Sequence, residues 1–278
     1  MFVALVLAGL HCGLAGGEAA PIGGCAFDAQ TQSFKGAAVA QATCLLRKVK
    51  PKGSGATVQP IPDWLKSNVD QPVTVDREKL KAYLSARQIN AKDVGLSGAI
   101  GVAPKLRYFV IHDTSWPEIA QSAGFPANID ASSYSGNKLA NWTGKIRQRV
   151  NAMVARDGAS EVFQAWGATR PLPATKLEQT NLAGIGSRAV FVHVENVQPR
   201  LKPTNSFAWI APDPGLSPAQ EERLALAYVV ASFAAGRWLV PAYHFNIDEG
   251  LPNGHDDPQG GDLASWVQKV ENIASAAQ

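Results

Sequence analysis

The pattern of hydrophobic and polar positions predicts several buried strands. Residues 106–111 are apolar apart from Arg107, and residues 189–197 form the clearest run of β-branched and aromatic side chains. Runs of this kind are typical of central strands that are covered on both faces. A third apolar run covers residues 238–243, and residues 161–166 are a shorter candidate strand.

The clearest helix begins near Ser217. This residue is the expected N-cap, Pro218 suits the first helical position, and Gln220 would complete a capping box. The apolar residues that follow continue to Gly236, which is placed to end the helix. The helix would then lead directly into the strand at residues 238–243.

Other segments have helical patterns of different strength. Asp76 is the expected N-cap of a short amphipathic helix over residues 76–84. Residues 37–46 and 137–156 are also expected to be helical, and residues 115–136 to form a loop beside the first strand. Strands and helices in this order indicate an α/β (α+β) fold, in which helices flank a mixed central β-sheet.

The first residues of the chain have the character of a targeting segment. Residues 1–20 are mostly apolar, and Gly17-Glu18-Ala19 is similar to the small-x-small pattern at which signal peptides are cleaved. The apolar run is short for a membrane span, which needs about 20 residues. We therefore expect a signal peptide and export to the periplasm or the extracellular space. A buried first strand is the alternative, because the segment lacks basic residues.

The cysteines agree with export. Loss of residues 1–20 would remove Cys12 and leave Cys25 and Cys44 as a pair. A disulfide between them would suit an oxidising compartment, while two buried thiols are the alternative. Residues 21–100 are expected to form a small N-terminal extension with this disulfide, and residues 101–278 the main domain.

Composition and charge exclude one class of partner. The chain has 278 residues, of which 46% are hydrophobic and 18% charged, as in an ordinary globular protein. Its net charge of +3 is too small to indicate nucleic-acid binding. We expect no nucleic-acid partner and no stable membrane insertion of the mature protein, and the sequence does not indicate an oligomeric state.

Histidines are concentrated in and after the predicted strands. His112 and His244 each follow an apolar run, and His193 lies within one. A lone histidine in such a place is more often a hydrogen-bonded core residue, and we expect this of His193. The alternative is that His193 lines the cleft or orients a neighbour, because it shares a strand face with Glu195. Several histidines together, with Asp257 near one of them, favour a metal site instead. Imidazole and carboxylate ligands suit a borderline divalent cation, zinc above all.

The order of these motifs resembles that of the zinc-dependent N-acetylmuramoyl-L-alanine amidases of the amidase-2 type, which are related to phage lysozyme-type amidases and peptidoglycan recognition proteins. In that family a first strand ends in Val-Ile-His, and this chain has Val110-Ile111-His112-Asp113-Thr114. A later strand carries Gly-Ile-Glu, which is similar to His193-Val194-Glu195. A final strand ends in histidine, and Lys-x-Asp-Pro-Gly follows; we align these with Tyr243-His244 and His255-Asp256-Asp257-Pro258-Gln259. The resemblance covers residues 106–270 and leaves residues 21–100 unexplained.

Carried over position by position, the resemblance implies a zinc (Zn2+) site with His112, His244 and Asp257 as ligands. Glu195 would be the acidic catalytic residue, which takes a proton from water and passes it towards the leaving amine. His255 stands where the family has lysine, and it would stabilise the tetrahedral oxyanion.

An alternative register uses His255 as the second ligand and Asp262 as the third. The loop between His244 and Asp257 is a few residues longer than is usual in the family, and Gln259 replaces the family's glycine. The first register keeps Asp-Pro together and uses the histidine at the end of a strand, so we prefer it.

The resemblance implies hydrolysis of the amide bond between N-acetylmuramic acid and the L-alanine of the stem peptide, with peptidoglycan or muropeptides as substrate. One alternative is a catalytically inactive peptidoglycan-binding module, which the changes at His255 and Gln259 favour. Another is a different zinc hydrolase, such as a peptidase or deacylase, on the same scaffold, because a fold does not define a substrate.

Overall fold

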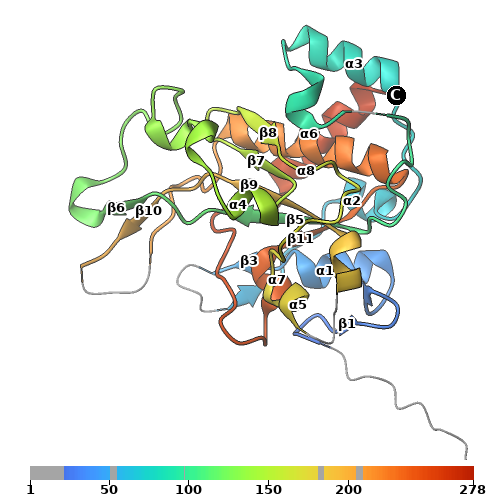
Figure 1. Ribbon diagram of the computed structural model, residues 1–278, viewed down its shortest axis with the longest axis horizontal. Coiled ribbons are helices and arrows are strands. Elements are labelled where there is room, and N and C mark those ends of the chain that lie inside the picture. Colours follow the sequence, from blue (N-terminus) through green and yellow to red (C-terminus); the bar gives the residue numbers. More distant parts are fainter. Residues whose placement is uncertain (1–21, 51–54, 97, 181–184, 205–208) are drawn as a thin grey trace, which may run out of the picture.

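A five-stranded sheet forms the centre of the protein (Figure 1). The structure is a computed structural model that describes residues 22–50, 55–96, 98–180, 185–204 and 209–278. β8 runs antiparallel to β7, whereas the other neighbouring strands are parallel, so the sheet is mixed as predicted. In spatial order the strands are β11 (Val240–Tyr243), β5 (Tyr108–Asp113), β9 (Phe191–Asn196), β7 (Ala152–Val154) and β8 (Ser160–Val162).

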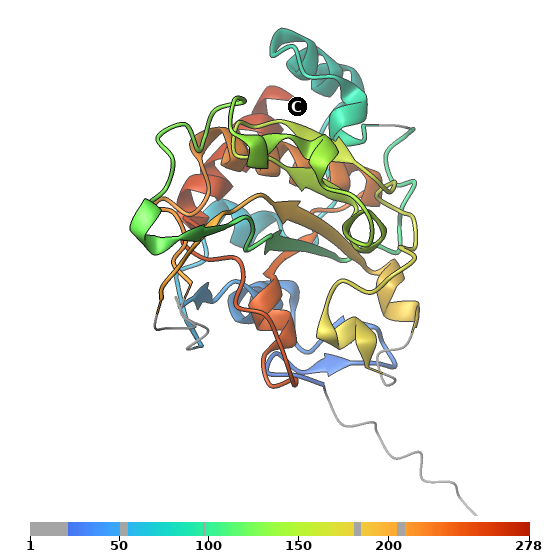
Figure 2. The same ribbon diagram turned by 60° about the vertical axis from the view of Figure 1, so that its left-hand side comes forward.

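Helices cover both faces of this sheet (Figures 1 and 2). The helices on one face are α6 (Pro218–Ala235), α8 (Leu263–Ala276), which packs against α6, and α3 (Arg77–Ala86), which packs against α8. Those on the opposite face are α1 (Ala38–Leu45), α5 (Lys176–Gln179) and α7 (His244–Asp248). Two further short helices are α2 (Asp63–Asn68) and α4 (Ile146–Arg149).

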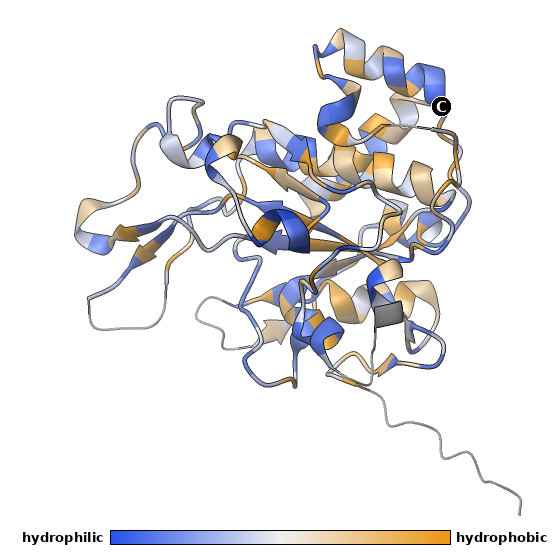
Figure 3. Ribbon diagram, viewed as in Figure 1, coloured by the Kyte–Doolittle hydropathy of each residue, from blue (hydrophilic) through white to orange (hydrophobic). Residues whose placement is uncertain are grey.

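The core lies between the sheet and these helices. Every residue of β5, β9 and β11 is buried, as expected for strands covered on both faces. From Leu224 onwards α6 is almost wholly apolar, and it contributes Leu224, Tyr228 and Phe233 to the core (Figure 3). The coarse fold class predicted from the sequence is therefore confirmed.

The helix α6 begins and ends where the sequence predicts. The side chain of Ser217 accepts a hydrogen bond from the backbone N–H of Gln220, and Gly236 ends the helix with a left-handed φ of 77°. The capping box is wrong, because the Gln220 side chain donates to the carbonyls of Val154 and Val197 instead, both at 3.0 Å. This helix start is thereby fixed to β7 and to the end of β9.

The helix predicted over residues 137–156 is wrong. The segment contains α4, the strand β7 and short 3-10 turns, and Gly144 interrupts it with a φ of 71°. A short apolar run does not distinguish a helix from a buried strand, and here pairing with β9 makes residues 152–154 a strand. The neighbouring strand β8 is shorter than predicted, since it ends at Val162.

The N-terminal region shares the main hydrophobic core. The rings of Phe27 and Phe34 pack against Phe191 of β9, and the disulfide between Cys25 and Cys44 is present. Asp76 caps α3 as predicted, through bonds from the N–H groups of the next turn. Short strand pairs in this region are β1 (Phe27–Asp28) with β2 (Ser33–Phe34), and β3 (Lys48–Val49) with β4 (Ala56–Thr57). The expected signal peptide lies outside the described residues.

Residues 115–136, which were expected to form a loop, include a short strand. β6 (Glu118–Ala120) pairs in parallel with β10 (Arg200–Lys202), and the two form an arm that extends beside the central sheet (Figure 1). The 3-10 turns among the described residues are Ala91–Val94, Gln121–Ala123, Ser135–Asn137, Leu139–Asn141 and Ile185–Ala189. Among the described residues, no helix combines the length and the apolar character that crossing a bilayer requires.

Candidate metal centre

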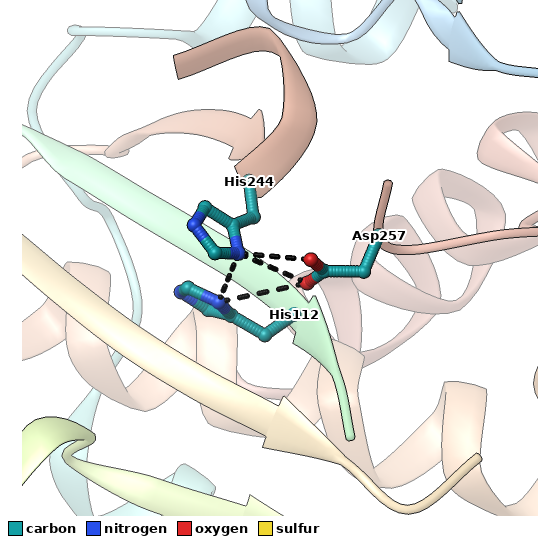
Figure 4. Close-up of side chains that lie close together, drawn as sticks. All are labelled: His112, His244 and Asp257. Atoms are coloured by element: carbon teal, nitrogen blue, oxygen red, sulfur yellow. Dashed lines mark hydrogen bonds and ion pairs between the residues drawn. The ribbon is translucent and has the colours of Figure 1, made fainter. Parts of the chain in front are cut away.

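Two neighbouring parallel strands bring His112 and His244 together. His112 lies near the end of β5, and His244 directly follows β11, which pairs with β5. Parallel strands end at the same edge of a sheet, so side chains at these ends converge. The Nδ1 atoms of the two rings lie 3.0 Å apart (Figure 4).

Asp257 completes this group from the loop between α7 and α8. Its Oδ1 lies 2.9 Å from His244 Nδ1, and its Oδ2 lies 3.7 Å from His112 Nδ1 (Figure 4). All three side chains are buried, and one ligand atom from each lies within 4.8 Å of the others. Two imidazole nitrogens and a carboxylate oxygen suit a borderline divalent cation, with room for a further ligand. The residues present therefore fit a metal ion.

Hydrogen bonds hold Asp257 in place. Its Oδ2 accepts from the backbone N–H of Asp113, and its carbonyl accepts from Phe245 N at 2.9 Å. Asp113 in turn accepts from Gln259 N at 2.9 Å and forms a buried ion pair with Arg200 at 2.6 Å. The loop that carries the third ligand is thus fixed to the end of β5.

The electrostatic surroundings give the two histidines opposite properties. Burial, together with His244 and His193, lowers the pKa of His112 well below its usual value. Burial also opposes the charge on His244, but Asp257 and Asp248 outweigh it and raise the pKa of His244 well above its usual value. Burial raises the pKa of Asp257, but His244 lowers it more. In the metal-free protein, the positive charge of the protonated His244 ring therefore compensates the negative charge of Asp257. A bound cation would take over this role.

Glu195 lies beside His112 on the next strand. The two residues are direct partners in the parallel β5–β9 pair, so their side chains share a face of the sheet. Burial, followed by the charges of Asp257 and Asp113, raises the pKa of Glu195 well above its usual value. Glu195 and the three candidate ligands line one open cleft, which Arg149 and Thr114 also border.

His255 and Asp262 occupy different surroundings. The ring of His255 is half-exposed at the rim of the cleft, with Nδ1 3.3 Å from His244 Nε2, the nitrogen that faces away from Asp257. Asp262 caps α8 through a bond from Ser265 N. Among the described residues, a second group that could hold a metal contains His244, Asp248 and His255, but neither group includes Asp262.

Several buried residues behind the ligands were missed or misjudged. His193, for which a structural role was preferred to lining the cleft or orienting a neighbour, lies with its Nδ1 2.7 Å from His112 Nε2, and Asp248 Oδ2 lies 2.9 Å from His244 Nε2. The spacing of His244 and Asp248 by four residues was a usable signal, because such residues meet on one helix face. It was overlooked because this segment was expected to be a loop rather than the helix α7.

Comparisons with known proteins do not assign a family. No family model matches the chain, and no solved structure matches it. A curated relative, the spectinabilin polyketide synthase system protein NorC from Streptomyces orinoci, is 33% identical over 94 residues. That match covers 34% of this chain, and the chain spans only 4% of the length of that relative. The candidate site therefore carries the functional argument.

Proposed function

We propose that this protein is an exported zinc-dependent amidase that cleaves the amide bond between N-acetylmuramic acid and the L-alanine of the stem peptide. The observation that carries the proposal is the convergence of His112, His244 and Asp257 in a cleft that Glu195 also lines. The order of these residues along the chain is that of the amidase-2 type, which the sequence resembles.

The metal would supply a polarising charge. When bound to these ligands, zinc would lower the pKa of a coordinated water to about 7 and polarise the scissile carbonyl. Glu195 is the proposed proton carrier, because it lines the cleft beside the ligands and its pKa is raised well above its usual value, mainly by burial. It takes a proton from the attacking water and delivers one to the leaving amine.

His255 is assigned to the developing oxyanion. Its ring borders the cleft, and burial and the nearby His244 lower its pKa, so at neutral pH it acts as a neutral N–H donor. A lysine ammonium could also donate an N–H to the oxyanion. A His255→Lys variant should therefore retain activity, with a pH profile that is flatter below neutrality, where His255 titrates.

The setting supports a cell-wall substrate. The disulfide between Cys25 and Cys44 fits an oxidising compartment, which is where peptidoglycan lies. The small positive charge of the chain suits an anionic polymer. We propose that peptidoglycan or released muropeptides are the partner.

The test is the product of the reaction. Zinc-loaded protein is incubated with muropeptides, and mass spectrometry is used to detect a free stem peptide that begins with L-alanine together with the intact sugar. Release of both products, lost in Glu195→Gln, supports the proposal. Binding without release indicates the inactive module, and cleavage at another amide or ester indicates a different zinc hydrolase.

A further inference from the structure

A continuous buried chain of polar groups extends behind the ligand His112. His112 Nε2 lies 2.7 Å from His193 Nδ1, and His193 Nε2 faces Glu178 Oε1 at 3.5 Å. Glu178 forms an ion pair with Arg170. The side chains of His193, Glu178 and Arg170 are fully buried, and buried polar groups of this kind are costly unless they are paired.

The proton positions follow from this geometry. If His112 Nδ1 offers its lone pair to a metal, then Nε2 carries the proton and donates it to His193 Nδ1. His193 must then carry its own proton on Nε2, directed towards the Glu178 carboxylate. Each nitrogen along the chain has one defined role, so the arrangement selects one tautomer of His112.

The other histidine has an equivalent partner. His244 Nε2 lies 2.9 Å from Asp248 Oδ2, so a proton on Nε2 leaves Nδ1 free to face His112 and Asp257. Asp248 is 1% exposed, so few water molecules can compete for its oxygens.

One short segment holds both outer carboxylates. Asp248 accepts from the backbone N–H groups of Lys176 and Leu177, at 2.9 and 3.0 Å. Glu178 accepts from those of Ala174 and Thr175, at 2.7 and 3.2 Å. Four successive N–H groups at the start of α5 are thus divided between Asp248, the partner of His244, and Glu178, which faces the partner of His112.

We propose that His193 and Asp248 are positioning residues that orient His112 and His244 for metal binding. Residues 174–178 fix the positions of His193 and Asp248 relative to each other. The inference rests on the metal site of the proposed function but not on its substrate. Outer partners of this kind typically change metal affinity by about 10- to 100-fold when they are removed.

The experiment measures metal binding rather than turnover. Zinc affinity is determined by competition with a chromophoric chelator, and the visible absorption spectrum of the cobalt-substituted protein reports how the ligands are oriented. We compare the full chain with His193→Leu, His193→Asn and Asp248→Asn. Both Asp248 oxygens accept backbone N–H groups, so the amide nitrogen of Asp248→Asn would face a donor and disturb the contact with His244. His193→Asn retains an acceptor near the position of Nδ1, whereas His193→Leu has none. Glu249→Gln is the matched control. It removes the charge of the residue next to Asp248, but the Glu249 carboxylate pairs with Arg47 and not with a histidine.

The expected result is a loss of affinity of about 10- to 100-fold in His193→Leu and Asp248→Asn, with altered cobalt bands. His193→Asn should restore most of the affinity, and Glu249→Gln should leave it unchanged. Unchanged affinity and spectrum in both His193→Leu and Asp248→Asn would overturn the inference, as would a parent protein that binds no metal. If His193→Leu does not fold, the zinc affinity and cobalt spectrum of Asp248→Asn alone test the inference. A protein that binds zinc in this way but cleaves no muropeptide would refute the proposed substrate and leave this inference standing.

Discussion

The Nδ1 atoms of His112 and His244 face each other at 3.0 Å, although 132 residues separate them in the chain. Both rings are buried, and Asp257 approaches the same point. Without a metal, the charged His244 ring donates its Nδ1 proton at this point, whereas a divalent cation would bind all three groups at once. This relationship between two strand ends is the basis of the proposed chemistry.

Glu195→Gln should separate metal binding from catalysis. Glutamine preserves the size of the side chain but cannot transfer a proton, so zinc content should be unchanged while kcat falls by about 10²- to 10⁴-fold. The measurement is muropeptide turnover beside metal analysis. Glu161→Gln, which changes a glutamate paired with Arg147 on β8, should remain active. Full activity of Glu195→Gln would exclude the assigned role.

Part of this site could be predicted from the sequence. His112 and His244 follow apolar runs that read clearly as strands, and strand order brings such ends together. Asp257 was found through its place in Asp-Pro after a histidine. These patterns are local, so they can be recognised in a single sequence.

Two of the outer partners could not be found in the same way. Glu178 and Arg170 reach His193 only because tertiary packing brings a loop against the end of β9. Residues 137–156 are a second example of a tertiary contact that the sequence pattern does not predict, because strand pairing overrides their helical pattern. What depends on contacts between distant segments is not encoded in the spacing of residues.

Arg200 and Lys202 provide a matched test of the buried ion pair. Both lie on β10, but Arg200 pairs with Asp113 in full burial, while Lys202 pairs with Glu118 at the surface. Removing one partner of a buried pair leaves an uncompensated charge, so Arg200→Leu should lower the free energy of unfolding by about 3–5 kcal/mol. Lys202→Leu should change it by less than about 1 kcal/mol.

Urea denaturation of both variants gives the comparison. Arg200→Leu should also weaken zinc binding, because Asp113 holds the backbone that carries Asp257. Equal stability of the two variants would mean that the Asp113 pair does not support the site.

The disulfide should contribute measurably to stability. It joins Cys25 and Cys44 across 19 positions, and closing a loop of this length stabilises the folded state by about 3 kcal/mol in the chain-entropy model. The double variant Cys25→Ser/Cys44→Ser should therefore unfold at lower urea concentration. A reducing agent should destabilise the parent to the same extent and leave the double variant unaffected. A parent that does not respond to reduction would count against a stabilising disulfide.

His193 should make the metal-free protein less stable as the pH falls. Burial, with the charge of Arg170, lowers the pKa of His193 to about 4, whereas an unfolded histidine titrates near 6.5. Between these values the unfolded chain binds the proton and the folded chain does not. Stability from this group is therefore complete above about pH 6.5 and is lost on acidification, by up to about 1.4 kcal/mol per pH unit.

The check is a series of denaturation curves between pH 7.5 and about 4.5, recorded after chelation of metal. His193→Asn removes the titrating group, so its unfolding free energy should fall less steeply with acidification than that of the parent. Identical slopes in the two proteins would show that His193 is not held neutral in the folded state.

The most direct test of the account is the zinc content of the purified protein. The parent is compared with His244→Ala and His255→Ala after each has been supplied with zinc and freed of excess metal. We predict about one zinc ion per chain in the parent and in His255→Ala, and none in His244→Ala. Loss of zinc in His255→Ala with retention in His244→Ala would favour the alternative register. A parent that binds no zinc would contradict the central claim that His112, His244 and Asp257 form a metal site.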